Sequence, residues 1–119
     1  MSLTPMIEDV SDEEEALLTD LNSKFSSVSV KKVHRKNGMV ELSLVAQMPA
    51  GTSMSYNEIL FKIPKGFRPT SSLLMLAMAN DLTWAFNIYS SGIAQAAGAL
   101  STSSIKYFQA YMIYMAKDE

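Results

Sequence analysis

Cysteine is absent from this chain of 119 residues, which excludes disulfides, thiolate nucleophiles and zinc–thiolate sites. Glycine and proline are scarce as well, with five and four residues, and the glycines are too scattered to form a phosphate-binding loop. No apolar run approaches the ~20 residues that cross a bilayer, and the acidic N-terminal part lacks the basic region of a signal peptide. We therefore expect no membrane insertion, no metal site and no cofactor.

Charge is also scarce, since 18% of the residues are charged whereas 48% are hydrophobic. A chain of this length fits one domain with one hydrophobic core. So little charge on a small domain indicates that part of its apolar surface is covered in an oligomer.

The few charges are unevenly distributed along the chain. Residues 8–20 hold seven acidic residues and no basic one, whereas residues 21–119 hold all ten lysines and arginines and five acids. The basic run at residues 31–36 has no interleaved aromatic residues for base stacking, and the sequence pI is about 5.4. These features argue against nucleic-acid binding.

The acidic segment has the pattern of a helix start. Ser11-Asp12-Glu13-Glu14 matches the S-x-x-E capping box, and acidic residues suit the positive end of a helix dipole. Apolar residues then recur at helical spacing, at Leu17, Leu18, Leu21 and Phe25. We predict a helix from Asp12 to Lys24 within an arm formed by residues 1–26. The arm either packs on its own domain, joins protomers in a short parallel bundle, or is disordered.

The rest of the chain, residues 27–119, reads as β-strands separated by turns. Apolar and polar residues alternate around Asn37-Gly38, the pair most typical of a tight hairpin. The predicted strands are 27–35, 39–48, 55–63, 71–79, 82–89, 93–100 and 105–115. About seven short strands predict a single antiparallel β-sandwich or small barrel.

The alternation also assigns side chains to faces. In the second strand we place Val40, Leu42, Leu44 and Ala46 together, and in the third strand Ile59, Phe61 and Ile63 point inward. Residues 71–79 are apolar on both sides, so this strand is either buried on both faces or covered on one face by a partner chain. Ile105, Tyr107, Gln109, Tyr111 and Ile113 share one face of the last strand.

Catalytic chemistry finds little support in this sequence. His34 is the only histidine and lies in a basic run, which disfavours its charged form. No motif supplies a nucleophile or a group to orient the imidazole, so His34 is interpreted as a surface residue beside a turn. The acidic residues of the arm point in different directions on a helix and do not make a metal site. We therefore expect a protein that is not an enzyme.

A polar and aromatic group near one predicted strand is the candidate binding site. Trp84 offers a face that can pack on a pyranose ring, although its alternation with Leu82 and Phe86 places it on the core face. The core and the ligand-contact interpretations both stay open for Trp84. The candidate saccharide-binding residues are Trp84, Tyr89, Asn87, Asn80 and Asp81.

Several motifs occur in an order that points to a family. A strand ends in Ile63-Pro64-Lys65-Gly66-Phe67-Arg68-Pro69, and an apolar strand and then Asn87-Ile88-Tyr89-Ser90-Ser91-Gly92 follow. The chain closes with the aromatic strand at residues 105–113, and Asn37-Gly38-Met39-Val40 opens an earlier strand. Over about residues 28–115 the chain resembles the C-terminal head domain of bacteriophage receptor-binding proteins and tail fibres.

The resemblance implies a β-sandwich or barrel that forms a homotrimer on an N-terminal helical neck. It implies a virion location after synthesis in the host cytoplasm, contacts with other virion tail proteins, and adhesion to host cell-wall saccharides without catalysis. The family's glycan contacts follow no motif, so no residue is carried across by position. The alternative is a structural part of a tail, baseplate or capsid fibre that makes only protein contacts.

Overall fold

The computed structural model describes residues 13–79 and 81–119, which form ten β-strands and no helix. The strands are β1 Glu14–Leu17, β2 Ser27–Lys36, β3 Met39–Met48, β4 Ser53–Met54, β5 Ile59–Lys62, β6 Leu73–Met78, β7 Thr83–Ile88, β8 Ile93–Ala96, β9 Leu100–Ser101 and β10 Lys106–Met115. All of their pairings are antiparallel. The predicted antiparallel β fold is confirmed, and the additional strands are the short β1, β4 and β9.

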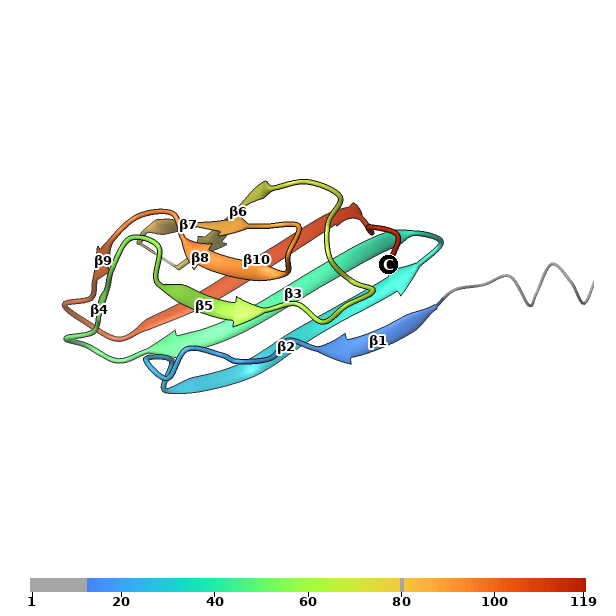
Figure 1. The fold of residues 1–119 in the computed structure, drawn as a ribbon. Helices are drawn as coiled ribbons and strands as arrows, with labels where there is room; N and C mark the ends of the chain where they lie inside the picture. Colours follow the sequence, from blue (N-terminus) through green and yellow to red (C-terminus); the bar gives the residue numbers. More distant parts are fainter. Residues whose placement is uncertain (1–12, 80) are drawn as a thin grey trace, which may run out of the picture.

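Eight of the strands form one curled sheet in the order β1-β2-β3-β10-β6-β7-β8-β5 (Figure 1). The chain just after β1 reaches β5 at the opposite edge, where the Thr19 and Lys62 backbones exchange hydrogen bonds of 2.9 and 2.8 Å. β4 and β9 pair in a separate two-stranded sheet. The architecture is therefore a half-barrel made from a single sheet, rather than two sheets packed face to face.

The β2–β3 hairpin lies at one end of the molecule, together with the start of β1 and the C-terminus (Figure 1). Its turn residues, Asn37 and Gly38, have φ angles of 54° and 79°, the left-handed pair that matches the twist of a hairpin. β4 and β9 lie at the opposite end (Figure 1). The hairpin prediction is confirmed.

The predicted helix from Asp12 to Lys24 is wrong over its described part, because residues 14–17 form the edge strand β1. Acidic side chains of this segment lie opposite basic ones of β2: Glu14 contacts Arg35 at 2.9 Å and Glu15 contacts Lys32 at 3.5 Å. The acids are thus paired across strands instead of capping a helix. Ser11 of the expected capping box, with the rest of residues 1–12, lies outside the described residues.

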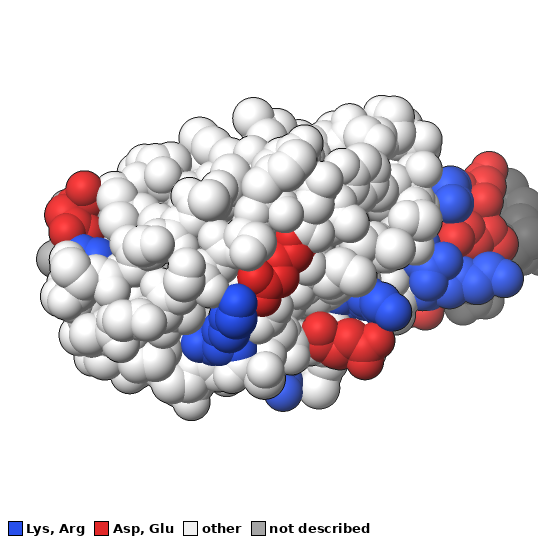
Figure 2. Space-filling view, turned by 60° about the vertical axis from the view of Figure 1, so that its left-hand side comes forward, with Lys and Arg blue, Asp and Glu red and all other residues white. Residues whose placement is uncertain are grey.

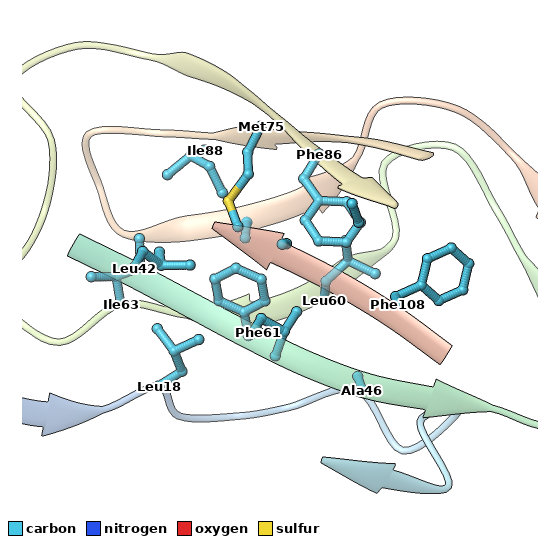
Figure 3. Close-up of a cluster of buried hydrophobic side chains, with 14 of the residues drawn as sticks. Leu18, Leu42, Ala46, Leu60, Phe61, Ile63, Met75, Phe86, Ile88 and Phe108 are labelled. Atoms are coloured by element: carbon cyan, nitrogen blue, oxygen red, sulfur yellow. The ribbon is translucent and has the colours of Figure 1, made fainter. Parts of the chain in front are cut away.

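The core lies on the concave side of the curled sheet (Figure 3). The inward face predicted for β3, with Val40, Leu42, Leu44 and Ala46, is buried as expected. Leu18, which directly follows β1, is also buried and lies near Phe61 in this view. Phe61 and Phe86 meet edge to face with ring centroids 6.2 Å apart, so β5 and β7 share the core.

The third predicted strand, residues 55–63, is wrong in its length and in the inward direction predicted for Ile59. β5 covers only Ile59–Lys62, and its pairing with β8 shifts between Ile59 and Phe61. This bulge buries Leu60 and Phe61 in succession and leaves Ile59 exposed. The inward positions of Phe61 and Ile63 are confirmed.

β6 buries one of its two apolar sides. Met75 and Ala77 face the core, whereas Leu74, Leu76 and Met78 are exposed in the single chain. Burial of this strand on both faces within one chain is therefore wrong. Cover by a partner chain, and with it the homotrimer, stays a prediction.

Candidate functional site

Trp84 lies in the core, where only 4% of its surface is exposed. Its indole N–H donates to the carbonyl oxygen of Gly98 at 3.0 Å, and its ring meets Phe86 edge to face at 5.0 Å. Of the two interpretations left open by the sequence, the structure shows the core position for Trp84 in the single chain.

The other predicted saccharide residues are spread along and beyond β7. Asn87 is half-buried on the outward side of that strand, and Tyr89, also half-buried, follows its end. Asp81 precedes β7 and accepts a hydrogen bond from the buried Lys106. Because β7 is extended and lies between them, Asp81 and Tyr89 are roughly 25 Å apart. Asn80 lies outside the described residues. The structure therefore does not bring these residues together into one site.

The motifs that carry the family resemblance do come together. The N–H of Ile63 donates to the carbonyl of Gly92 at 2.7 Å, which joins the proline-rich loop to the turn after β7. Arg68, from the same loop, donates from Nε to the carbonyl of Ile63 at 3.0 Å. The C-terminal strand closes this unit, since the Tyr114 hydroxyl donates to the Phe67 carbonyl. Burial raises the pKa of Tyr114, which keeps the hydroxyl protonated as a donor.

Glu119 also packs against the proline-rich loop. Its carboxylate accepts from the Gly66 N–H at 2.7 Å and lies 3.5 Å from Arg68. Burial works to raise the pKa of this carboxyl, but the Gly66 N–H and the nearby cations, Lys117 first, lower it below its ordinary value. Arg68, Lys117 and Glu119 are therefore engaged with one another and hold the loop.

The outward side of β6 and β10, here called the β6–β10 face, carries seven of the twelve exposed large hydrophobic side chains of the described residues. β6 contributes Leu74, Leu76 and Met78, and β10 contributes Tyr107, Gln109, Tyr111, Ile113 and Met115. Apart from Gln109 these side chains are hydrophobic, with exposed fractions between 51% at Leu76 and 64% at Met115. The shared face of Tyr107, Gln109, Tyr111 and Ile113 was predicted from alternation and is confirmed.

Two open hollows lie side by side on this face and share Met78 and Gln109. One, of about 520 Å³, extends over Val30, Leu76 and Tyr111, and the other, of about 480 Å³, extends to Tyr107. The ladder between β6 and β10 spans only the pairs Gln109–Met78 and Ala110–Ala77. Because of these hollows the face is uneven rather than flat.

A small charged group borders the β6–β10 face. His34 lies between two carboxylates, with Nε2 2.8 Å from Glu13 and Nδ1 3.6 Å from Glu41. The Tyr111 hydroxyl donates to Glu41, and this bond lowers the pKa of Glu41 and raises that of Tyr111. In space the contacts of His34 are therefore acids, although its sequence neighbours are bases. No metal-binding group of His, Asp or Glu occurs among residues 13–79 and 81–119.

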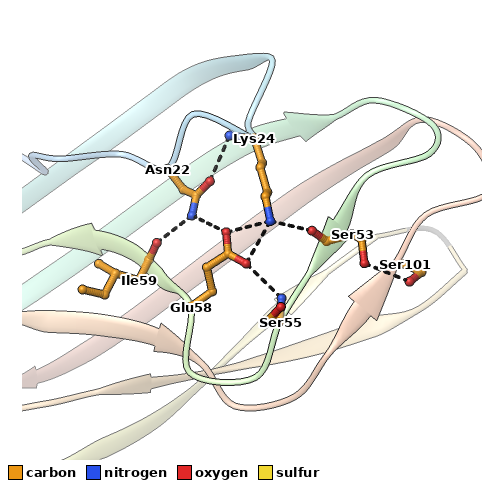
Figure 4. Close-up of polar contacts among 7 residues, drawn as sticks. All are labelled: Asn22, Lys24, Ser53, Ser55, Glu58, Ile59 and Ser101. Atoms are coloured by element: carbon orange, nitrogen blue, oxygen red, sulfur yellow. Dashed lines mark hydrogen bonds and ion pairs between the residues drawn. The ribbon is translucent and has the colours of Figure 1, made fainter.

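A second polar network ties the segment after β1 to the β4–β5 turn (Figure 4). Glu58 accepts from the Ser55 N–H at 2.9 Å, from Lys24 at 3.0 Å and from Asn22 at 3.1 Å. The Ser55 N–H, ahead of Lys24, lowers the pKa of Glu58. The network also fixes the turn that presents Tyr56, whose side chain is 62% exposed.

Figure 2 shows that acidic and basic side chains on the visible face sit next to each other in small groups, with wide uncharged areas between them. No broad basic area is present on that face (Figure 2). Within the described residues, no helix is long and apolar enough to span a membrane.

No family model matches the chain, and no curated protein matches it.

Proposed function

We propose that this chain is a non-enzymatic adhesion domain of a bacteriophage virion, the head of a tail fibre or baseplate receptor-binding protein, which binds host cell-wall saccharide as a homotrimer. The observation that carries the proposal is the joining of the Ile63–Pro69 loop, the Gly92 turn and the closing strand. Motifs that are far apart in the sequence and resemble one family make direct contacts with one another. This is expected where such motifs encode a shared fold.

The site chemistry is consistent with adhesion. The only histidine contacts Glu13 and Glu41, and the lysines, arginines and carboxylates described above are engaged in ion pairs. We infer that these groups hold the fold rather than perform acid–base catalysis, because they are engaged with one another. A binding domain needs only a rigid scaffold that presents side chains.

Tyr56 is the side chain that we expect to contact saccharide. Outside the β6–β10 face it is the one exposed aromatic side chain in the described part, since Tyr89 is half-buried and the others are buried. It lies in a turn fixed by the Asn57 N–H to Ala96 carbonyl bond of 2.9 Å and by the Glu58 network. An exposed aromatic ring on a rigid turn loses little conformational entropy when a sugar stacks on it.

The proposal is tested by retention of the purified protein on a glycan array and on bacterial cell-wall preparations. We expect wild type to be retained, and Tyr56→Ala to bind at least tenfold more weakly. Leu17→Ala, which also removes an exposed hydrophobic side chain but from β1, is the matched control and should bind normally. The pair Asn87→Ala and Tyr89→Ala tests the site predicted from the sequence. No retention of the intact oligomer on any preparation would contradict the proposed adhesion.

A structural virion component that makes only protein contacts is the second candidate. The aliphatic residues of the β6–β10 face favour it, because Leu74, Leu76 and Ile113 offer no hydrogen bonds to a sugar. This candidate predicts binding to other tail proteins and none to host cell walls, so the same retention experiment separates the two.

A further inference from the structure

The β6–β10 face is unusual for the surface of a chain that acts alone. Monomeric proteins seldom expose apolar patches of more than a few hundred Å². Here seven large hydrophobic side chains on two neighbouring strands each keep more than half of their surface exposed. We propose that this face binds other copies of this chain, and that the β10 row of one copy packs on the β6 row of the next.

The size of the face supports a second copy as its occupant. A large side chain has on the order of 150–200 Å² of surface, so the seven side chains together expose roughly 600–800 Å². A stable protein–protein interface buries about 800 Å² on each partner. Because each copy contributes one row to a given contact, the hydrophobic side chains of the two rows together supply roughly half of a standard interface, and the residues bordering the rows supply the rest.

The relief of the face supports the same occupant. Tyr107 and Tyr111 project from β10 on either side of Gln109, and the two hollows open beside them over Leu76 and Met78. One surface thus carries both projecting rings and apolar hollows. A surface with both features can bind a copy of itself without any further component.

The two rows also suit a closed ring. Because β6 and β10 are distinct, one copy can offer its β10 row to one neighbour and its β6 row to another, which is the heterologous contact that builds cyclic oligomers. The charged group around His34, Glu41 and Lys32 then lies at the rim, where interfaces are usually polar. The inference deepens the proposed homotrimer and rests on it for the number of copies.

The chemistry of the face is less suited to other occupants. The rows themselves carry no lysine or arginine to attract anionic lipid headgroups. Gln109 is their one amide, and a saccharide needs several hydrogen-bonding partners. The experiment must therefore be able to detect binding of a membrane or of a saccharide to this face.

The experiment measures molar mass by light scattering across a range of protein concentrations. We expect wild type at the mass of three copies. Leu76→Glu in the β6 row and Ile113→Lys in the β10 row should each shift the protein toward monomer by at least a tenfold rise in dissociation constant. Ile59→Glu places the same charge on an exposed hydrophobic position of β5, outside the face, and should leave the mass unchanged.

Mixing the two face variants provides the second measurement. If the β10 row meets the β6 row of the neighbour, Leu76→Glu and Ile113→Lys protomers present opposite charges at one junction, so the mixture should associate more tightly than either alone. Circular dichroism of each variant checks that the strands are intact. A wild-type monomer, or folded face variants that keep the wild-type mass, would overturn the inference.

Two further assays measure binding to vesicles of anionic lipid and to a glycan array. If either binding is lost in Leu76→Glu but kept in Ile59→Glu, the face binds that ligand and the inference is overturned. The retention experiment with Tyr56→Ala does not involve this face. Failure of the adhesion proposal and failure of the interface proposal are therefore separate results.

Discussion

Gly92 and Ile63 are in such close contact that only glycine fits at position 92. The Ile63 N–H donates to the Gly92 carbonyl at 2.7 Å, and a Cβ added to Gly92 would lie 2.6 Å from the Ile63 carbonyl oxygen and 2.5 Å from Arg68 Nε. Gly92 also has a φ of +91°, which L side chains rarely adopt. The turn after β7 and the proline-rich loop are thus packed backbone to backbone.

Gly92→Ala should be the most destabilising of the glycine-to-alanine substitutions. Positive φ costs about 1–3 kcal/mol for a residue other than glycine, and the contact with the Ile63 backbone adds to this cost, because backbone cannot move aside as a side chain can. We expect a loss of roughly 3 kcal/mol or more in the free energy of unfolding, measured by urea denaturation.

Two matched substitutions separate the causes. Gly38→Ala has a φ of +79° but open space around the added Cβ, so it should show the backbone strain alone. Gly98→Ala has neither feature and should be close to wild type. Equal losses for Gly92→Ala and Gly38→Ala would show that the contact with Ile63 costs nothing.

Local pattern alone was enough to place most of the described fold. Alternation gave the bounds of β2, β3, β7 and β10 within a residue or two, and in β3, β7 and β10 it follows one buried face, whereas β2 carries a bulge between Val28 and Val30. Asn37-Gly38 defined the hairpin for the same local reason. The β5 bulge escaped prediction because Leu60 and Phe61 break the alternation in a way that only the pairing with β8 explains.

The helix prediction failed because the capping pattern and the apolar spacing are both local signals. Glu14–Leu17 instead pair with β2 along the backbone and Leu18 enters the core, and these long-range contacts outweigh local helix propensity. Leu18 was placed on a helix stripe with Leu17, yet Leu18 is buried and Leu17 is exposed. The charge contrast between residues 8–20 and the β2 segment was the signal that could have shown this pairing.

The candidate site was predictable only in part. Alternation put Tyr107, Gln109 and Tyr111 on one face, but it could not show that β6 lies beside β10, since the two strands are about 30 residues apart in sequence. Asp81 and Tyr89 were grouped because both flank turns. They flank opposite ends of β7, so their sequence proximity does not become proximity in space.

Glu58→Gln should lower stability in a pH-dependent way. The pKa of Glu58 is below its ordinary value of 4.5 in the folded state, so its ionised form contributes stability above that pH, and the contribution is lost as the pH falls through the folded-state pKa. We expect a loss of about 1 kcal/mol at pH 7, because the side chain is partly open to solvent. Urea unfolding between pH 2 and 7 should show the difference from wild type shrinking at acid pH.

Glu15→Gln is the control for this prediction. Its contact with Lys32 is 3.5 Å long and both side chains are more than half exposed, so its removal should leave the unfolding curve unchanged. A difference between Glu58→Gln and wild type that persists at pH 2 would mean that the ionised carboxylate is not the cause.

Tyr114→Phe should remove a hydrogen bond that stabilises the folded protein fully only below pH 10. The hydroxyl donates to the Phe67 carbonyl, which is left without this donor in the variant, so we expect a loss of about 1–2 kcal/mol at pH 7. Burial raises the folded-state pKa of Tyr114, whereas an unfolded tyrosine ionises near pH 10. The contribution is thus complete below pH 10 and declines as the pH rises above it.

Unfolding measurements between pH 7 and 11 check this expectation. The stability advantage of wild type over Tyr114→Phe should be constant up to about pH 9.5 and then decrease. Tyr56→Phe, which alters an exposed hydroxyl outside the β6–β10 face, should follow wild type over the same range. An advantage that grows at alkaline pH has the wrong sign and would contradict the assignment.

Trp84 is the only tryptophan, so its fluorescence reports on one position in the core. We expect short-wavelength emission in the folded protein, a red shift on unfolding, and no change when a retained saccharide is added, because the ring is covered by Phe86 and Phe108.

Trp84→Phe should lower the free energy of unfolding by roughly 2 kcal/mol, since it removes the bond to the Gly98 carbonyl and leaves a small cavity. The variant should nevertheless keep full saccharide retention when assayed at a temperature where it is folded. A saccharide-induced spectral shift in wild type, together with lost retention in folded Trp84→Phe, would place the ligand against the indole and restore Trp84 as a binding residue.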